Sequence, residues 1–211
     1  MRGGAVVAAR SSGSPGVDVV LVGSGRIGEE EWAAVLAESV ETRSVHAALV
    51  ARGVEQVDAL ALAAVQDAAF AVAAGGVERV VVDEVDEVPL LAVAGGVAPD
   101  VLVRETGRRL DEVAALAVAV APYRDRVVAV RGAEEVLGAG RREIVAQATG
   151  RRTARDIAFA VGAGLHPVVV GISLMLGEGL LEIASPEVSF SFSHGGLRSL
   201  GPRVEAGERP G

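Results

Sequence analysis

The stretch that decides how the C-terminal part of this chain folds is Thr149-Gly150-Arg151-Arg152-Thr153-Ala154-Arg155-Asp156-Ile157-Ala158. Gly150 ends the short segment before it, and Thr153 is a residue type that caps the N-terminus of a helix. The helix expected after this cap covers residues 154–161 and turns Ile157 and Ala158 toward a core. Working outward, the spacing predicts one helix before this stretch, over 141–149, and another after it, over 167–176.

Beyond the third helix, apolar residues alternate with polar ones in two short runs on either side of Ser185-Pro186, which predicts strands over 180–184 and 188–192. Three short helices followed by two strands is the element order of a winged helix-turn-helix unit. The sequence therefore predicts such a unit over residues 141–192, a joint at Gly138-Ala139-Gly140, and a flexible tail over 193–211.

A second stretch, Leu174-Met175-Leu176-Gly177-Glu178-Gly179-Leu180-Leu181-Glu182-Ile183, completes a recognisable pattern. With the first stretch it resembles winged-helix regulators, whose pattern runs G-R-x-T-x-x-D-I-A…L-x-x-G-L-V-x-I, and it is similar to the winged-helix component of actinobacterial conservon-type signalling operons. The resemblance implies a third helix that reads DNA through polar and basic side chains. Here that helix carries His166 and Ser173 but no arginine, which favours docking of a protein partner over reading of DNA bases.

The N-terminal part is expected to be a flexible segment over 1–16 and an α/β or α+β sensing or dimerisation domain over 17–137. Patterning predicts helices over 29–38, 58–74 and 108–121, and strands over 17–22, 45–50, 80–82, 89–94, 101–103 and 127–130. The element order between 45 and 121 also looks like a roadblock-type dimerisation domain. That resemblance implies a possible homodimer.

Composition excludes several kinds of chemistry. The chain has no cysteine, and its 20 basic residues are all arginine, so disulfides, thiolate metal sites and Schiff-base catalysis are ruled out. The net charge of −8 opposes a generally basic nucleic-acid binder. No segment is long and apolar enough to predict a signal peptide or membrane span, and a cytoplasmic protein is expected.

The run Gly23-Ser24-Gly25-Arg26-Ile27-Gly28 matches the G-x-G-x-x-G pattern of dinucleotide sites. A small nucleotide-binding Rossmann-like enzyme is therefore one alternative, resting on Gly23, Gly25 and Gly28. Three glutamates directly after the run would repel a pyrophosphate, and no acidic residue stands about 20 positions on to bind a ribose. We expect a structural turn here and no cofactor.

No catalytic or metal site is predicted. The densest acidic cluster, formed by Asp83, Glu84, Asp86 and Glu87, has no calcium-loop order and is interpreted as an exposed turn. The three histidines, at 46, 166 and 194, stand far apart and in no ligand spacing.

The strongest contact candidates are basic. The residues expected to contact a partner or nucleic acid are Arg141, Arg142, Arg151, Arg152, Arg155 and His166. The leading hypothesis is a non-enzymatic regulatory or signalling protein whose winged helix docks a protein partner. The alternatives are a DNA-binding transcriptional regulator, the nucleotide-binding enzyme, and a structural interaction protein without regulated output.

Overall fold

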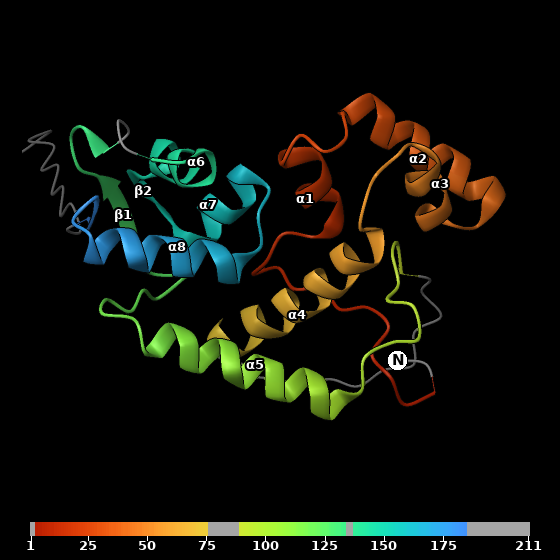
Figure 1. The fold of residues 1–211 in the computed structure, drawn as a ribbon, viewed down its shortest axis with the longest axis horizontal. Coiled ribbons are helices and arrows are strands. Elements are labelled where there is room, and N and C mark those ends of the chain that lie inside the picture. Colours follow the sequence, from red (N-terminus) through yellow and green to blue (C-terminus); the bar gives the residue numbers. More distant parts are fainter. Residues whose placement is uncertain (1–2, 76–88, 134–136, 185–211) are drawn as a thin grey trace, which may run out of the picture.

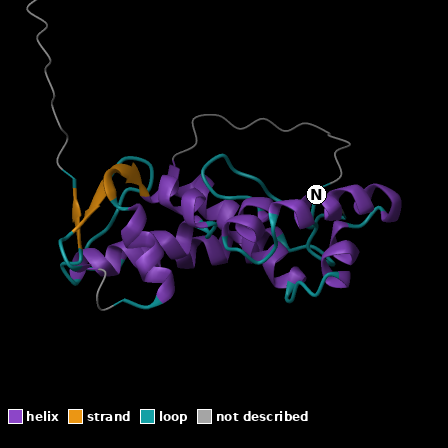
Figure 2. Cartoon of the chain, turned by 90° about the horizontal axis from the view of Figure 1, so that it is seen from above, coloured by secondary structure: helices purple, strands orange, loops and turns teal. Residues whose placement is uncertain are grey.

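The computed structural model describes residues 3–75, 89–133 and 137–184. Over these residues the protein is mostly helical, with eight helices and one small three-stranded antiparallel sheet, which places it in the α+β class. Figures 1 and 2 show the strands gathered at one end of an elongated molecule and helices filling the remainder.

The N-terminal part consists of five helices. They are α1 (Val17–Gly23), α2 (Glu29–Thr42), α3 (Val45–Ala51), α4 (Val57–Gly75) and α5 (Pro99–Ala114). Local chemistry explains where two of them begin. The Glu31 carboxylate accepts a hydrogen bond from the N–H of Gly28 at 3.1 Å, and the Ser44 hydroxyl accepts one from the N–H of Ala47 at 3.1 Å.

The predicted helices over 29–38 and 58–74 are confirmed as α2 and α4, whereas the strands predicted in this part are wrong. Residues 17–22 and 45–50 are helical in α1 and α3, residues 101–103 lie in α5, and residues 89–94 form a loop. A short apolar run has no period that separates a strand from a buried helix, so packing decides. The strand predicted over 80–82 lies outside the described residues.

Helix α5 differs from its prediction at both ends. It begins at Pro99, where a proline is tolerated because the first N–H groups of a helix lack partners, and it ends at Ala114 rather than just before Pro122. Only the overlap with the predicted range, 108–114, is confirmed as helix.

The C-terminal part interleaves helices and strands. Its elements are β1 (Arg126–Ala129), α6 (Ala139–Gln147), β2 (Thr149–Thr153), α7 (Ala154–Val161), α8 (Leu165–Gly177) and β3 (Leu181–Ile183). The three predicted helices are confirmed, and so are the strands over 127–130 and 180–184. The strand over 188–192 lies outside the described residues.

The sheet has the order β2-β1-β3, with Val127 opposite Ile183 and Arg126 opposite Thr153. Strand β2 was not predicted, because its sequence Thr-Gly-Arg-Arg-Thr lacks the alternation of apolar residues that marks a strand. Strand β1 belongs to the segment expected as the N-terminal domain, yet it is the central strand of a sheet whose other strands follow the predicted joint at 138–140.

Helices α7 and α8 form a sharp corner of 117°. Thr153 and Asp156 make a capping box at the start of α7, where the Thr153 hydroxyl accepts from the N–H of Asp156 and the Asp156 carboxylate accepts from the N–H of Thr153. Gly162 ends α7 in the left-handed conformation with φ of 62°. That conformation is open to glycine at little cost and lets the chain turn into α8.

The buried apolar side chains form two clusters. One lies among α1 to α4 and includes Leu21, Val35 and Leu49. The other joins Phe70 of α4 to the C-terminal elements, with Ile157 and Ile172 fully buried. Helix α4 therefore contributes to both clusters and connects the two parts of the molecule.

By length and composition alone, α4 could cross a membrane, and the bent pair α7 and α8 meets the same criterion if counted as one span. The core helix of a soluble protein meets this criterion too, and the buried face of α4 supplies both core clusters.

Candidate functional site

The most unusual polar group in the described structure is Asp67, which is 4 % exposed in the middle of apolar helix α4. Its two carboxylate oxygens accept hydrogen bonds from the backbone N–H groups of Leu165 and His166, at 2.7 and 2.8 Å. These are the first two N–H groups of α8, and the first N–H groups of a helix have no acceptor within the helix. Gly164, at the N-cap position, has no side chain that could accept their hydrogen bonds. A carboxylate is the favoured group at this end of a helix dipole.

The side chain of His166 is packed into the same junction. Its ring meets the ring of Phe70 edge to face, with centroids 5.0 Å apart, and its Nε2 lies 3.5 Å from Oε2 of Glu112. Nε2 is buried and has no hydrogen-bond partner within the described structure. Burial lowers the pKa of His166, and the charge of Arg109 lowers it further, while Glu112 and Asp67 oppose the change.

A cavity of about 270 Å³ opens beside these groups, lined on its polar side by Asp67, Arg109 and His166. Arg109 is held in place by hydrogen bonds to Glu105 at 2.8 Å and to Gln66 at 2.8 Å. The apolar side comes from Val17 and neighbouring residues of α1 and α4.

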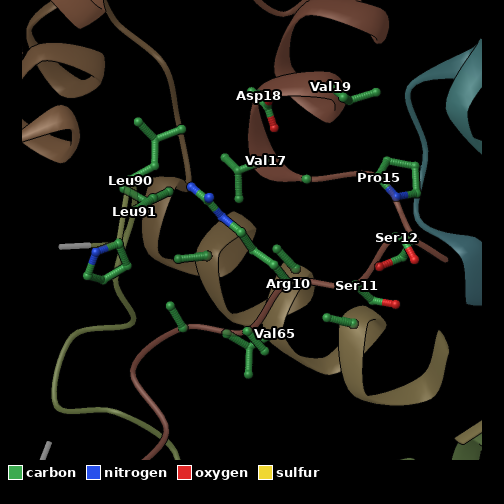
Figure 3. Close-up of a pocket in the computed structure, with 18 of the residues that line it drawn as sticks. Arg10, Ser11, Ser12, Pro15, Val17, Asp18, Val19, Val65, Leu90 and Leu91 are labelled. Atoms are coloured by element: carbon green, nitrogen blue, oxygen red, sulfur yellow. The ribbon is translucent and has the colours of Figure 1, made fainter. Parts of the chain in front are cut away.

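A larger cavity, of about 450 Å³, is lined by the segment that precedes α1, from Ala8 to Gly16. Pro15, Val17 and Ala64 line both cavities. Figure 3 shows the side chain of Arg10 extending across the larger cavity, with Val17 and Leu90 on either side of its guanidinium. The junction between the N-terminal helices and the α7–α8 corner therefore holds both cavities, and we take it as the candidate site.

The segment expected to be a flexible N-terminus makes fixed contacts in this junction. The carbonyl of Ser12 accepts two hydrogen bonds from Arg155, and a Cβ added to Gly13 would lie 2.3 Å from the hydroxyl of Tyr123. That hydroxyl donates to the carbonyl of Ala71 at 2.6 Å, and burial raises the pKa of Tyr123.

The contact residues predicted from the sequence are distributed over four elements, α6, β2, α7 and α8. On α6, Arg141 makes a bidentate ion pair with Glu178, at 2.9 and 2.7 Å, and Arg142 donates to the carbonyl of Leu137. The other three arginines lie on other elements: Arg151 and Arg152 are on β2 and Arg155 is on α7. Of the predicted set, only Arg155 and His166 reach the junction.

The glycine run at 23–28 has a different setting from a dinucleotide site. It follows helix α1, whereas that site requires a strand before the glycines. Gly23 instead allows two backbones to touch, because a Cβ placed on it would lie 2.8 Å from Cα of Gly162. Gly28 is the N-cap of α2. Packing against Gly162 and the start of α2 are therefore the structural roles of Gly23 and Gly28.

The remaining candidates carry no site in the described structure. Nε2 of His46 lies 3.2 Å from Oδ1 of Asp58, and both side chains are largely exposed. Within the described ranges, no three acidic or histidine side chains are placed to hold a metal ion. The acidic cluster at 83–87 and His194 lie outside the described residues.

Sequence reasoning missed Asp67, Arg109 and Arg10. A lone carboxylate inside the apolar run 59–74 is a usable signal for Asp67, since an unpaired buried charge would cost several kcal/mol and so implies a partner. Nothing local distinguishes the other two from ordinary surface arginines. No family model, curated protein or solved structure matches this chain.

Proposed function

We propose that this is a non-enzymatic, cytoplasmic regulatory protein, whose C-terminal part is a winged helix-turn-helix unit that docks a protein partner rather than reading DNA bases. The element order from β1 to β3 and the 117° corner between α7 and α8 support the winged helix-turn-helix interpretation. The observation that carries the docking function is the bond between Asp67 and the start of α8.

Base reading by a helix-turn-helix unit uses the N-terminal residues of its second helix, which must enter the major groove. Here that end of α8 is covered by α4, through Asp67, and the His166 side chain is turned toward Phe70 and Glu112. DNA entry would have to break these contacts and leave the Asp67 carboxylate buried without its donors.

The part of α8 that does face solvent suits a protein better than a nucleic acid. Pro167 and Leu174 are exposed, and Glu178 at its end is paired with Arg141. Apolar side chains offer buried area to a partner protein but no hydrogen bonds to base edges beyond contact with a thymine methyl.

DNA binding by phosphate contact is the competing function, and exposed Arg151 on β2 is the observation in its favour. Such binding is weak, independent of sequence, and steeply dependent on salt. A fluorescence-anisotropy titration of a labelled random duplex, at about 150 mM salt and at lower salt, separates the two functions. We expect no saturable binding at the higher salt. Tight, sequence-specific binding that is lost in an Arg151→Glu, Arg152→Glu double variant with an intact fold would overturn the proposal.

Docking itself is tested by placing a photo-crosslinking residue at Leu174 of the full chain in its native cell, with Val40 on α2, 79 % exposed, as the matched control position. We expect a protein adduct of one size that forms from position 174 and not from position 40. An adduct with DNA at position 174, or no adduct specific to it, contradicts docking through α8.

A further inference from the structure

The smaller cavity at the junction, of about 270 Å³, has walls from both halves of the chain. Its apolar lining includes Pro15, Val17 and Val20 in and before α1, and Leu60, Ala63 and Ala64 of α4. An apolar cavity of about 150 Å³ is enough to hold benzene, whereas the sites of larger ligands begin at about 300 Å³. The smaller cavity therefore has room for one ring with a small polar group, and not for a nucleotide.

Two charged side chains, Asp67 and Arg109, line the polar end of this cavity, and each already has compensating partners. The Asp67 carboxylate accepts the first two N–H groups of α8, where the helix dipole favours a negative charge. On α5, Arg109 and Arg108 pair with Glu105, and Arg108 pairs also with Glu112. These pairs match two arginines with two glutamates.

The third polar group at this end, the imidazole of His166, is uncharged at neutral pH. Burial, and then the charge of Arg109, hold its pKa below the ordinary value of 6.5. Among the described residues, the wall therefore presents no unbalanced charge. A charged ligand would lose its hydration on entry and gain no opposite charge in return, so the cavity selects for an uncharged ligand.

The same groups keep unused hydrogen-bonding capacity of both kinds. A carboxylate has about four acceptor sites, and the described contacts of Asp67 use two of them. Nε of Arg109 donates to Glu105 and its Nη2 to Gln66, while its Nη1 makes no hydrogen bond within the described residues. Gly164 lines the cavity beside the carboxylate, and a Cβ added there would lie 3.1 Å from Oδ1 of Asp67. The glycine thus leaves the acceptor uncovered on this side.

We propose that this cavity binds a small uncharged amide with an apolar ring: the amide N–H donates to Asp67, the amide carbonyl accepts from Arg109, and the ring packs among the apolar side chains of α1 and α4. A primary carboxamide has one donor end and one acceptor end, which match a carboxylate and a guanidinium. Such a ligand would contact α1, α4, α5 and the start of α8 together and so stabilise the junction. The proposal goes beyond docking and holds whichever partner the α7–α8 corner contacts.

The test uses the full chain and three probes of the same shape: benzamide, benzoate and protonated benzamidine, which are neutral, negative and positive. Because His166 lines the cavity, its imidazole Cε1 proton reports binding by NMR at constant pH, and exposed His46 is the internal reference. We expect benzamide to shift the His166 resonance saturably, with a Kd of about 1 mM, the weak affinity of a single-ring ligand. The two charged probes should bind at least about tenfold more weakly.

Two pairs of variants locate the binding. Arg109→Gln should weaken benzamide binding about tenfold, because it removes a charge-assisted donor. Its matched control is Arg108→Gln, which also removes a partner of Glu105 but lies outside the cavity, and it should leave the Kd unchanged. Ala63→Leu fills space at the wall and should abolish binding, whereas Ala69→Leu, the same change on α4 outside the cavity, should not.

Equal affinity for the three probes would overturn the proposal, because the polar end would then select nothing. This comparison uses the original protein, so it decides even where a variant fails to fold. An unchanged benzamide Kd in both Arg109→Gln and Ala63→Leu, each with a cooperative thermal unfolding curve, would also overturn it. So would a benzamide titration that leaves the His166 resonance unmoved.

Discussion

The carboxylate of Asp67 accepts the backbone N–H of His166 at 2.8 Å, across 99 positions of sequence. Its other carboxylate oxygen accepts the N–H of Leu165, so Asp67 of α4 supplies acceptors for the first two N–H groups of α8. The start of α8 has a glycine where a capping side chain would normally stand, so its cap is supplied by tertiary contact. This side chain is thus one of the contacts that couple the two halves of the molecule.

Replacing that side chain should loosen the coupling. We expect Asp67→Ala to lower the free energy of unfolding by about 1–3 kcal/mol, because two buried N–H groups lose their acceptor. In a chain of this length each kcal/mol lowers Tm by about 2–4 °C. Urea unfolding measures the effect. Asp111→Ala, on the exposed side of α5, is the control and should stay within about 0.5 kcal/mol of the original protein; an equal loss in both variants would remove the special role of Asp67.

The close approach of Gly23 to Gly162 leads to a stability prediction, and a second glycine provides a control whose expected change in stability has the opposite sign. Gly23→Ala should destabilise the protein by about 1–3 kcal/mol, since its Cβ would lie 2.8 Å from the backbone of Gly162. Gly107, inside α5, has no atom within 4 Å of an added Cβ, so Gly107→Ala should stabilise by about 0.5–1 kcal/mol. Thermal unfolding of both variants is the measurement, and a neutral Gly23→Ala would show that the two backbones do not touch.

His166 should make stability depend on pH. Burial holds its pKa below the ordinary value of 6.5, so the unfolded chain takes up a proton at a higher pH than the folded chain. The contribution of His166 to the free energy of unfolding therefore decreases as the pH falls from 6.5 to the pKa of His166 in the folded protein, and this contribution does not change with pH outside that window. Urea unfolding of the original protein and of His166→Gln, between about pH 5 and 8, should show a shallower slope in the variant.

The carboxylate of Glu112 lies 3.5 Å from Nε2 of His166 and favours the protonated form of the imidazole. Glu112→Gln should accordingly lower the pKa of His166 further, as read from the imidazole Cε1 proton by NMR. The His166→Gln spectrum assigns the resonance. A rise in the pKa would contradict the arrangement of charges described here.

Glu105 should titrate far below a free glutamate. Hydrogen bonds from Arg108, and then from Arg109, lower its pKa from 4.5 to about 2, although burial opposes them. The stabilisation is therefore complete above pH 4.5 and is lost as the pH falls toward 2. An NMR titration of the Glu105 carboxyl carbon measures the pKa directly. Glu105→Gln should cost about 0.5–1 kcal/mol at neutral pH, where solvent screens a partly exposed ion pair, and nothing below the pKa. A loss of stability that persists at the acid end would contradict the ion-pair explanation.

The sequence by itself determined the elements whose signals are local. Thr153 and Asp156 cap α7 within three residues, glutamates in the first turn begin α2, and glycines after 161 force the corner into α8. These interactions join neighbours along the chain, so the residue order contains them in full.

Only the tertiary structure decided the rest. Residues 17–22 and 45–50 became helices because their apolar side chains pack with α4, and β2 became a strand because β1 offered it an edge. The candidate site also depends on tertiary structure. Arg155 donates to the carbonyl of Ser12, 143 positions away, and the N–H of Leu165 donates to Asp67, 98 positions away. Contacts at such separations depend on how the whole chain folds. The apolar residues around Asp67 indicate that its carboxylate needs a partner, but no local pattern identifies Leu165 and His166 as that partner.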